Sequence, residues 1–473
     1  MDTKKLRQKI LDLAIRGKLV PQDPNDEPAS VLLERIRAEK EQLIKEGKIK
    51  RSKKSAATDK SHYENVPFEI PESWAWVTLS EVCEVARGGS PRPIKDYLTT
   101  NEDGVNWIKI GDTDKDGKYI NSTKEKIIPE GVHRSRFVHK GDFLLTNSMS
   151  FGRPYILNID GCIHDGWLVI SPFANTYVTE FLYFLLSSSF AYDQFADAAS
   201  GGVVSNLNSD KVANSYFPLP PEREQRRIIN ELNNWFKVVG ELDKNIQGVK
   251  SFVSRIKSKI LDLAISGKLV PQDPNDEPAI KLLKRINPGF EPCDNSHYEN
   301  LPQGWTIVGL HSVAEIITGS TPSKLNAEYY NGDVPFYKPN DLDQGRHVRC
   351  ASEYLSQQGK SISRSIPCNS IAVCCIGSIG KCGFIEKEGV TNQQINTIVP
   401  NDAILPLYMY YFCNSSTFID ELKSLSSAVT ISIVNKSKLS TIQIPLPPIA
   451  EQKRIISVIE KLYSHLDMIT AEL

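Results

Sequence analysis

Side chains suited to catalysis occur in this 473-residue chain, but their spacing matches none of the common catalytic patterns. The sequence contains no GxxxxGK[ST] phosphate loop, no Asn-Pro-Pro-aromatic tetrapeptide of amino-methyltransferases and no Gly-rich cofactor loop after a strand. His133, His139 and His164 have no patterned carboxylate or cysteine partner, so we interpret them as surface or core residues. We therefore expect no catalytic residue and no cofactor in this chain.

Closely spaced carboxylates are the residues best suited to bind a metal ion. Asp112, Asp114 and Asp116 follow a predicted strand, and carboxylate oxygens there could hold a hard cation. A second copy of this segment contains only Asp341 and Asp343. We interpret the carboxylates as a solvated turn and expect no metal site.

The amino-acid composition narrows the remaining classes of protein to which the chain could belong. The nine cysteines form no CxxC pair, so they predict neither a zinc site nor a disulfide framework, and Cys374, Cys375 and Cys382 lie in an apolar run typical of a core. The 56 basic and 57 acidic residues weaken the case for a stand-alone nucleic-acid-binding protein. The N-terminus lacks the apolar core of a signal peptide, and no run of about 18 apolar residues occurs, so we expect a cytoplasmic protein.

A long helix predicted between residues 222 and 267 organises the chain. Its apolar residues recur at alternating spacings of four and three, which is typical of the seam of a left-handed coiled coil, here about 53 Å long. Pro220 and Pro221 stand at its start, and Gly267 stands where a left-handed residue commonly closes a helix. Such a seam needs a partner helix. The seam residues are Ile228, Leu232, Trp235, Val239, Leu242, Ile246, Val249, Val253, Ile256, Ile260 and Leu263.

Two motifs occur twice, and their order indicates a circularly permuted duplication. Residues 9–29 and 259–279 differ at one position, and LPPEREQRRII at 219–229 resembles LPPIAEQKRII at 446–456. The chain's ends therefore repeat the two halves of the long helix in reverse order. We expect these halves, laid end to end, to rebuild a helix antiparallel to the central one, with the termini meeting near its middle. The alternative is two amphipathic helices that share ancestry without pairing. The seam continues through Ile455, Ile459, Leu462, Leu466 and Ile469.

Two equivalent globular units lie between the helical segments. Short strand-like runs alternate with polar turns in both, which predicts two mixed α/β domains. The expected fold class is α+β, with the two mixed α/β domains separated by two antiparallel coiled-coil helical regions, and with a pseudo-twofold that comes from the circularly permuted duplication. The predicted boundaries are 1–60 for the N-terminal half-helix, turn, short helix and basic linker, 61–220 for the first domain, 221–295 for the central helix and turn, 296–447 for the second domain, and 448–473 for the C-terminal half-helix.

Several loops can be matched between the two domains, although 95–135 and 324–366 barely align. A frame that is retained while its loops diverge suits one common partner and two different targets. A basic stretch at 45–61 occurs only in the first copy, and we interpret it as a solvated linker, with a phosphate-contacting arm as the alternative. The matched loops are RGGSPRP (87–93) with TGSTPSK (318–324), the turn ending at 153 with that ending at 381, and IHDGW (163–167) with TNQQI (391–395).

The permuted order of these motifs resembles that of the specificity (S) subunits of type I restriction–modification enzymes. The resemblance covers nearly the whole chain, because the repeated KILDLAI-GKLVPQ and LPP-EQ-RII motifs, the Gly-Ser-Pro loops and SNLNSDKV at 205–212 all contribute to it. It implies two target-recognition domains that each read one half of a bipartite DNA site. The helical regions would fix the spacer between the halves.

The resemblance also implies partners and a role in defence against foreign DNA. Two modification subunits would dock on the helices, bind S-adenosylmethionine and methylate adenine in double-stranded DNA. Restriction subunits, which use ATP and Mg, would join that core. The S subunit itself would be non-catalytic.

Side chains on the divergent loops are the candidates for contact with bases or phosphates. Arginine can bind guanine bidentately, and asparagine or glutamine can do so with adenine. In the first domain the candidates are Arg87, Ser90, Arg92, Lys109, Arg134, Arg136, Asn147 and Arg153. In the second domain they are Thr321, Ser323, Lys324, Lys338, Asn340, Arg346, Arg349, Lys381, Gln393 and Gln394.

The charge of the first domain opposes strong DNA binding. Residues 66–218 contain 13 Lys and Arg against 19 Asp and Glu, whereas phosphate neutralisation supplies most non-specific affinity. Either the basic residues gather on one face or the modification subunits supply the positive groove. Two other hypotheses stay open: a non-DNA interaction scaffold, and an enzyme that acts alone.

Overall fold

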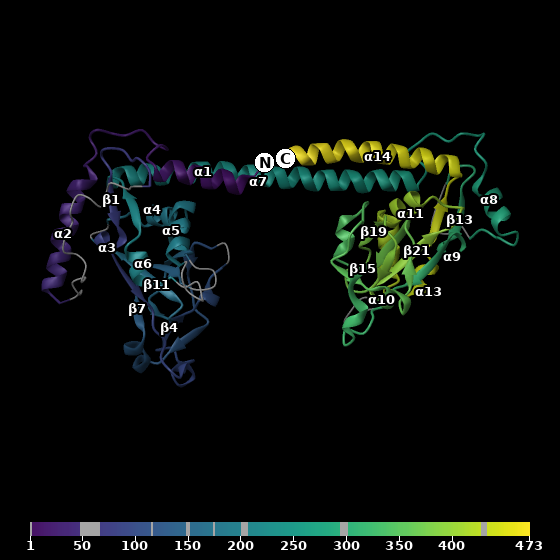
Figure 1. The fold of residues 1–473 in the computed structure, drawn as a ribbon. Coiled ribbons are helices and arrows are strands. Elements are labelled where there is room, and N and C mark those ends of the chain that lie inside the picture. Colours follow the sequence, from purple (N-terminus) through teal and green to yellow (C-terminus); the bar gives the residue numbers. More distant parts are fainter. Residues whose placement is uncertain are drawn as a thin grey trace. The chain divides into compact units, whose positions relative to one another are not determined.

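The computed structural model describes residues 2–47, 67–114, 117–147, 152–173, 176–199, 207–293, 301–426 and 433–473 (Figure 1). The chain divides into two compact units, residues 1–244 and 245–473. Each unit has its own hydrophobic core, and helix α7 (Glu222–Ile265) contributes residues to both. Most of the predicted basic linker lies outside the described residues.

In the first unit, apolar strands form two main sheets beside a short strand pair. β8 (Phe143–Thr146) and β9 (Pro154–Leu157) are buried along their whole length, as expected of strands inside a sheet. The strand pair is β1 (Ala75–Thr78) with β12 (Tyr216–Leu219). One sheet has the order β2 (Cys83–Arg87), β11 (Trp167–Pro172), β8 (Phe143–Thr146), β9 (Pro154–Leu157), β5 (Tyr119–Ile120). The other has the order β3 (Leu98–Thr99), β6 (Glu125–Ile127), β4 (Val105–Ile108), β10 (Gly161–Ile163), β7 (Arg136–Val138). The helices besides α7 are α1 (Thr3–Ile15), α2 (Ala29–Lys45), α3 (Leu79–Val82), α4 (Thr179–Leu186), α5 (Ser189–Ala199) and α6 (Ser209–Ala213).

The second unit repeats this arrangement. The strand pair is β13 (Thr306–Gly309) with β22 (Gln443–Leu446). One sheet has the order β14 (Ala314–Thr318), β21 (Ile395–Pro400), β18 (Ser370–Cys374), β19 (Cys382–Ile385). The other has the order β16 (Glu353–Leu355), β15 (Tyr330–Tyr337), β20 (Gly389–Thr391), β17 (Ser365–Ile366). The helices besides α7 are α8 (Ala279–Ile286), α9 (Leu310–Val313), α10 (Gln357–Ser361), α11 (Pro406–Cys413), α12 (Ser416–Ser424), α13 (Lys436–Ser440) and α14 (Ile449–Glu472).

The two units therefore share one strand order, since β2-β11-β8-β9 corresponds to β14-β21-β18-β19 and β6-β4-β10-β7 to β16-β15-β20-β17. A parallel pair occurs at the same place in both, β4 with β10 and β15 with β20, among otherwise mostly antiparallel strands. The prediction of two mixed α/β domains is confirmed.

Each unit contains a pair of helices that run in opposite directions. In the first unit, the Thr3 hydroxyl at the start of α1 bonds Asp243 in the middle of α7, whereas Gln22 beyond the end of α1 bonds Glu224 at the start of α7. In the second unit, Lys257 of α7 pairs with Asp467 late in α14 at 2.5 Å. Beyond the end of α7, Gln272 bonds Glu451 near the start of α14, so these two helices also run in opposite directions.

The repeated motifs bind each other, which explains why they recur together. The carboxylate of Glu224 accepts hydrogen bonds from the Gln22 amide (2.6 Å) and the Trp74 indole (2.9 Å), and Arg227 pairs with Asp26 at 2.6 Å. The second unit repeats each contact with its equivalent residues: Glu451 with Gln272 (2.8 Å) and Trp305 (3.0 Å), and Arg454 with Asp276 (2.6 Å).

In each unit a glycine follows the end of a helix, α1 in the first unit and α7 in the second. Gly17 and Gly267 have φ values of +66° and +69°, in the left-handed region predicted for Gly267. A Cβ atom at either position would lie 2.4 or 2.3 Å from the ring of Pro71 or Pro302. Both backbone conformation and close packing therefore require glycine.

The predicted seam is buried along only part of the helices. Ile228, Leu232, Val239, Ile246, Val253, Ile260, Ile455 and Ile459 are buried, and Leu242, Ile256, Leu462 and Leu466 are half-buried. The prediction fails for Trp235, Val249 and Ile469, which are 44%, 38% and 48% exposed.

The buried stripe of α7 turns away from Trp235 because the helix packs on the domain as well as on α1. Ile229 is buried beside Ile228, and Phe236 lies edge-on to Phe184 of α4 with ring centroids 5.6 Å apart. The burial of α14 decreases from Ile455 towards its C-terminal end, which leaves Ile469 exposed.

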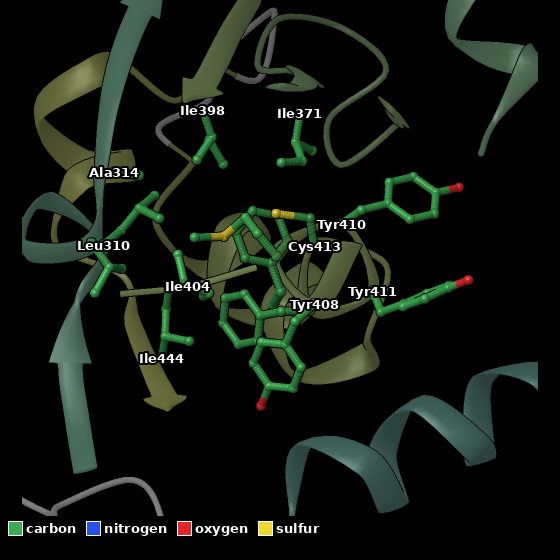
Figure 2. Packing of buried hydrophobic residues seen from close by; sticks show 14 of the residues in the cluster. Leu310, Ala314, Ile371, Ile398, Ile404, Tyr408, Tyr410, Tyr411, Cys413 and Ile444 are labelled. Carbon is green, nitrogen blue, oxygen red and sulfur yellow. The ribbon is translucent and has the colours of Figure 1, made fainter. Parts of the chain in front are cut away.

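The core of the second unit collects apolar side chains from its sheet, α9 and α11 (Figure 2). Cys413 lies inside this cluster, whereas the rings of Tyr410 and Tyr411 point together to one side of it (Figure 2). Cys374, Cys375 and Cys382 are buried as predicted, and burial raises the pKa of the Cys375 thiol to about 11.

Candidate nucleic-acid interface

The Gly-Ser-Pro loop of each unit is held against the start of strand β11 or β21. In the first unit, the N–H of Gly88 donates to the carbonyl oxygen of Trp167 (3.0 Å). In the second unit, the N–H of Gly319 donates to that of Ile395 (3.0 Å). The same backbone hydrogen bond therefore holds the Gly-Ser-Pro loop in place in both units and forms a shared backbone frame.

This frame depends on glycine at one position of each Gly-Ser-Pro loop. A Cβ atom on Gly88 would lie 2.2 Å from the carbonyl oxygen of His164, and one on Gly319 would lie 2.1 Å from that of Asn392. Any side chain there would push the loops apart, because the neighbouring carbonyl oxygen belongs to the backbone and cannot rotate away.

The turn after β8 or β18 joins the same frame. The N–H of Asn147 donates to the Gly166 carbonyl (3.1 Å), and the N–H of Cys375 donates to the Gln394 carbonyl (2.8 Å). We call the assembled loops the loop face. It consists of the described parts of residues 87–93, 147–153 and 163–167 in the first unit, and of 318–324, 375–381 and 391–395 in the second.

Asp165 organises the loop face of the first unit. Its carboxylate accepts from the Ser90 hydroxyl (2.9 Å) and lies 3.4 Å from a terminal nitrogen of Arg92. Its carbonyl accepts from Nε of Arg87 (3.0 Å) and from the Asn147 amide (2.8 Å). Partial burial by itself favours a higher pKa for the Asp165 carboxyl. The Ser90 hydrogen bond and nearby cations outweigh this effect, so the pKa lies below its usual value.

Four predicted residues of the first unit have other partners. Lys109 pairs with Glu125 at 2.5 Å, and Arg134 lies over the ring of Tyr97. Arg153 lies over the ring of Tyr155. Arg136 stays beside the loop face, because its Nε donates to the Arg87 carbonyl at 3.3 Å while its guanidinium lies near Glu84.

In the second unit, Gln393 occupies the position of Asp165. Its side-chain oxygen accepts from the hydroxyl of Thr321, the counterpart of Ser90. Gln394 accepts a hydrogen bond from the Asn392 amide at 2.9 Å. Ser323 and Lys324 lie on the same Gly-Ser-Pro loop, and both are exposed.

The remaining predicted residues of the second unit are mostly in ion pairs. Lys338 pairs with Glu353, which repeats the Lys109–Glu125 pair of the first unit and indicates a structural role. Lys381 pairs with Asp343 at 2.8 Å. Arg349 pairs with Glu386. Asn340 is exposed directly before the 3₁₀ turn η7 (Asp341–Gln344).

The placement of Arg346 does not fit the predicted contact with DNA. Its guanidinium pairs with Glu460 of α14 at 3.1 Å and lies 4.8 Å from the centre of the Phe384 ring. Arg346 also lines a groove of about 610 Å³ together with Tyr411 and Tyr463. It therefore fastens the domain to α14, because an arginine that spans a carboxylate and an aromatic ring is held on both sides.

The interpretation of the Asp clusters as a freely solvated turn needs correction. The Asp112 carboxylate accepts from the backbone N–H groups of Lys109 (2.8 Å) and Lys124 (3.2 Å). Asp341 is buried and accepts from Lys338 (2.7 Å) and Ser352 (2.8 Å). These carboxylates close a turn after a strand. Asp116 lies outside the described residues, and within those residues no group of three potential ligands is close enough to hold a metal ion.

Sequence reasoning missed one residue of the loop face, Asp165, and one residue that contacts it, Arg364. Asp165 could have been found, because the match of IHDG with TNQQ aligns it with the predicted Gln393. Arg364 donates to the Thr318 carbonyl at 3.0 Å, but it lies in a stretch that barely aligns between the copies, so only the folded chain places it there.

The sequence matches the family "Type I restriction modification DNA specificity domain" over residues 71–248 and 302–473, which is one match for each unit. The chain belongs to this family. The EcoEI specificity subunit of Escherichia coli is 27% identical, with 99% of this chain and 90% of the relative covered. The EcoAI specificity subunit of Escherichia coli is 28% identical, with 97% and 88% covered.

A solved structure supports the same fold. A chain from a study of complex assembly and conformational transition in a type I R-M system is 21% identical, with a TM-score of 0.55, and the alignment covers 86% of this chain and 94% of that one. In the described part of the chain, none of the helices combines the length and apolar character that a membrane span requires.

Proposed function

We propose that this chain is the DNA-specificity subunit of a type I restriction–modification complex and that each unit reads one half of a bipartite site. The observation that carries the proposal is the loop face. The two units share its backbone hydrogen bonds, yet the exposed side chains differ, with Asp165 and Arg92 in one and Gln393 and Ser323 in the other. One scaffold with two sets of polar side chains suits the reading of two different base sequences.

The helices fix the length of the spacer between the two half-sites and bind two modification subunits. Exposed apolar side chains support this assignment, because apolar side chains that gather on a surface commonly mark a contact with a partner protein. Trp235 and Val238 are 44% and 53% exposed on α7 in the first unit. Phe252 and Met468 are 60% and 53% exposed in the second. The near-identity of residues 9–29 and 259–279 supports docking of the same subunit twice.

The chain supplies recognition, and its partners supply the chemistry. The modification subunits bind S-adenosylmethionine and methylate adenine, and the restriction subunits use ATP and Mg for translocation and cleavage. We place the assembled complex in the cytoplasm, where it meets incoming DNA. The described residues of the loop face bring together hydrogen-bonding and cationic side chains, which suit contacts to bases and phosphates.

Sequencing of methylated bases in cells with and without this gene tests the function. Deletion should remove one bipartite methyl-adenine motif and leave other methylation unchanged. Restoration of the gene on a plasmid should restore the same motif. If the deleted strain keeps every bipartite motif, the chain does not confer DNA specificity.

A further inference from the structure

The tip of the loop face carries one hydrogen bond that is common to both units. A hydroxyl of the Gly-Ser-Pro loop donates to a longer polar side chain of the facing loop, from Ser90 to Asp165 and from Thr321 to Gln393. Both longer side chains keep access to solvent: the Asp165 side chain is 42% exposed, and Gln393 is exposed. The bond orients each polar group without burying it.

The residues around this bond differ as a set between the units. Arg87 and Arg92 accompany Asp165 in the first unit. Their counterparts beside Gln393 are Thr318 and Ser323. One tip thus combines two guanidinium groups with a carboxylate, and the other is uncharged at all three positions, although the glycine-dependent frame is the same.

The charged tip has the chemistry that recognises guanine. Nε of Arg87 donates to the Asp165 carbonyl, which leaves the terminal nitrogens of Arg87 for other acceptors. The Arg92 side chain is 82% exposed and lies only 3.4 Å from the Asp165 carboxylate. A guanidinium that is oriented in this way can donate to O6 and N7 of guanine.

The tip of the second unit, which is uncharged at these three positions, has the chemistry that recognises adenine. The side-chain oxygen of Gln393 has two lone pairs, and the Thr321 hydroxyl occupies one of them. The other lone pair can accept from N6 of adenine while the Gln393 amide donates to N7. The Thr321 hydroxyl therefore orients Gln393 without blocking a bidentate contact.

We infer that these equivalent tips are the positions where each unit reads one base pair, with Arg87 or Arg92, held by Asp165, selecting G·C and with Gln393, held by Thr321, selecting A·T. The inference rests on the proposed function and names side chains that determine its specificity. Asp165 and Thr321 are positioning residues, because they act through the side chains that they hold.

The direct test transfers the three residues of the second unit's tip to the equivalent positions of the first unit. The first unit receives Arg87→Thr, Arg92→Ser and Asp165→Gln, and methylated motifs are sequenced in cells whose only specificity subunit is this variant. One G·C pair in one half-site should change to a preference for A·T. The other half-site and the spacer length should not change. In a separate chain, Gln393→Ala should relax one A·T position in the opposite half-site by about ten- to one-hundred-fold.

A matched control separates specificity from general charge. Arg37→Gln changes the net charge by the same amount as the triple exchange, but it lies on exposed α2 and should leave the motif unchanged. If the triple variant fails to assemble with the modification subunits, the single variants Arg87→Thr, Arg92→Ser and Gln393→Ala, all at exposed positions, decide the question. A motif that stays the same at every position in all three single variants would overturn the inference. The proposed function would survive that result, since it depends on the motif lost upon gene deletion.

Discussion

The carboxylate of Glu224 accepts a 2.9 Å hydrogen bond from the indole of Trp74, a residue 150 positions earlier in the chain. Glu451 accepts the same bond from Trp305 at 3.0 Å in the second unit. Both glutamates begin a helix and both tryptophans precede the first strand of a domain. This pair joins the helical frame to each recognition domain.

Glu224→Ala should destabilise the first unit by about 1–3 kcal/mol, because the Trp74 indole and the Gln22 amide would both lose a buried acceptor. Thermal unfolding of the full chain measures the change. Glu222→Ala is the matched control, since Glu222 lies on the same helix turn and is exposed. A loss of stability that is equal in the two variants would contradict the assigned role of Glu224.

The stability of the chain should depend on pH through the same glutamates. Burial raises the pKa of Glu224 and of Glu451 above the ordinary value of 4.5. The folded state therefore binds more protons than the unfolded state between pH 4.5 and the raised pKa, and stability falls as pH rises through that window. Urea unfolding of wild type and of Glu224→Gln at several pH values tests this. The advantage of the wild type should increase towards pH 4.5, and a pH-independent difference would refute it.

Gly17→Ala should cost more stability than Gly47→Ala. Both glycines have a left-handed backbone, with φ of +66° and +71°. Only at Gly17 would the new Cβ meet an obstacle, 2.4 Å from Pro71, whereas nothing lies within 4 Å of Gly47. The Gly47 variant should lose about 1 kcal/mol, and the Gly17 variant should lose more. Melting temperatures that rank the other way would show that the turn can relax.

Leu242→Pro should abolish assembly with the modification subunits while both recognition domains stay folded. Leu242 lies inside α7, where proline removes a helical hydrogen bond and costs about 3 kcal/mol or more. Co-purification measures assembly, and limited proteolysis follows the domains. Leu242→Ala keeps the helix and is the control. A proline variant that still co-purifies would contradict the role of the continuous helix.

The purified chain alone should bind its DNA site weakly, because residues 66–218 contain 13 basic against 19 acidic residues. The complex with the modification subunits should bind tightly and lose affinity steeply as salt rises. Gel-shift titrations at several salt concentrations compare the two. Tight, specific binding by the chain alone would show that its own basic residues are sufficient.

Local patterns in the sequence predicted the individual secondary-structure elements well. The spacing of Ile228 and Leu232 identifies a helix face, and the recurrence of residues 9–29 at 259–279 identifies the duplication, because periodicity and identity can be read without any knowledge of distant contacts. Gly267 was also predictable, since a helix end favours a left-handed residue.

Only the folded chain decided which side chains share a surface. Trp235 fits the heptad spacing yet is exposed, because packing on the domain rotates the buried stripe of α7 towards Phe236. Arg346 was predicted to contact DNA but pairs with Glu460 of α14. Asp165 gathers Ser90, 75 positions away, through contacts that no local pattern encodes. Element type follows from near neighbours in the chain, whereas the composition of a site depends on long-range packing.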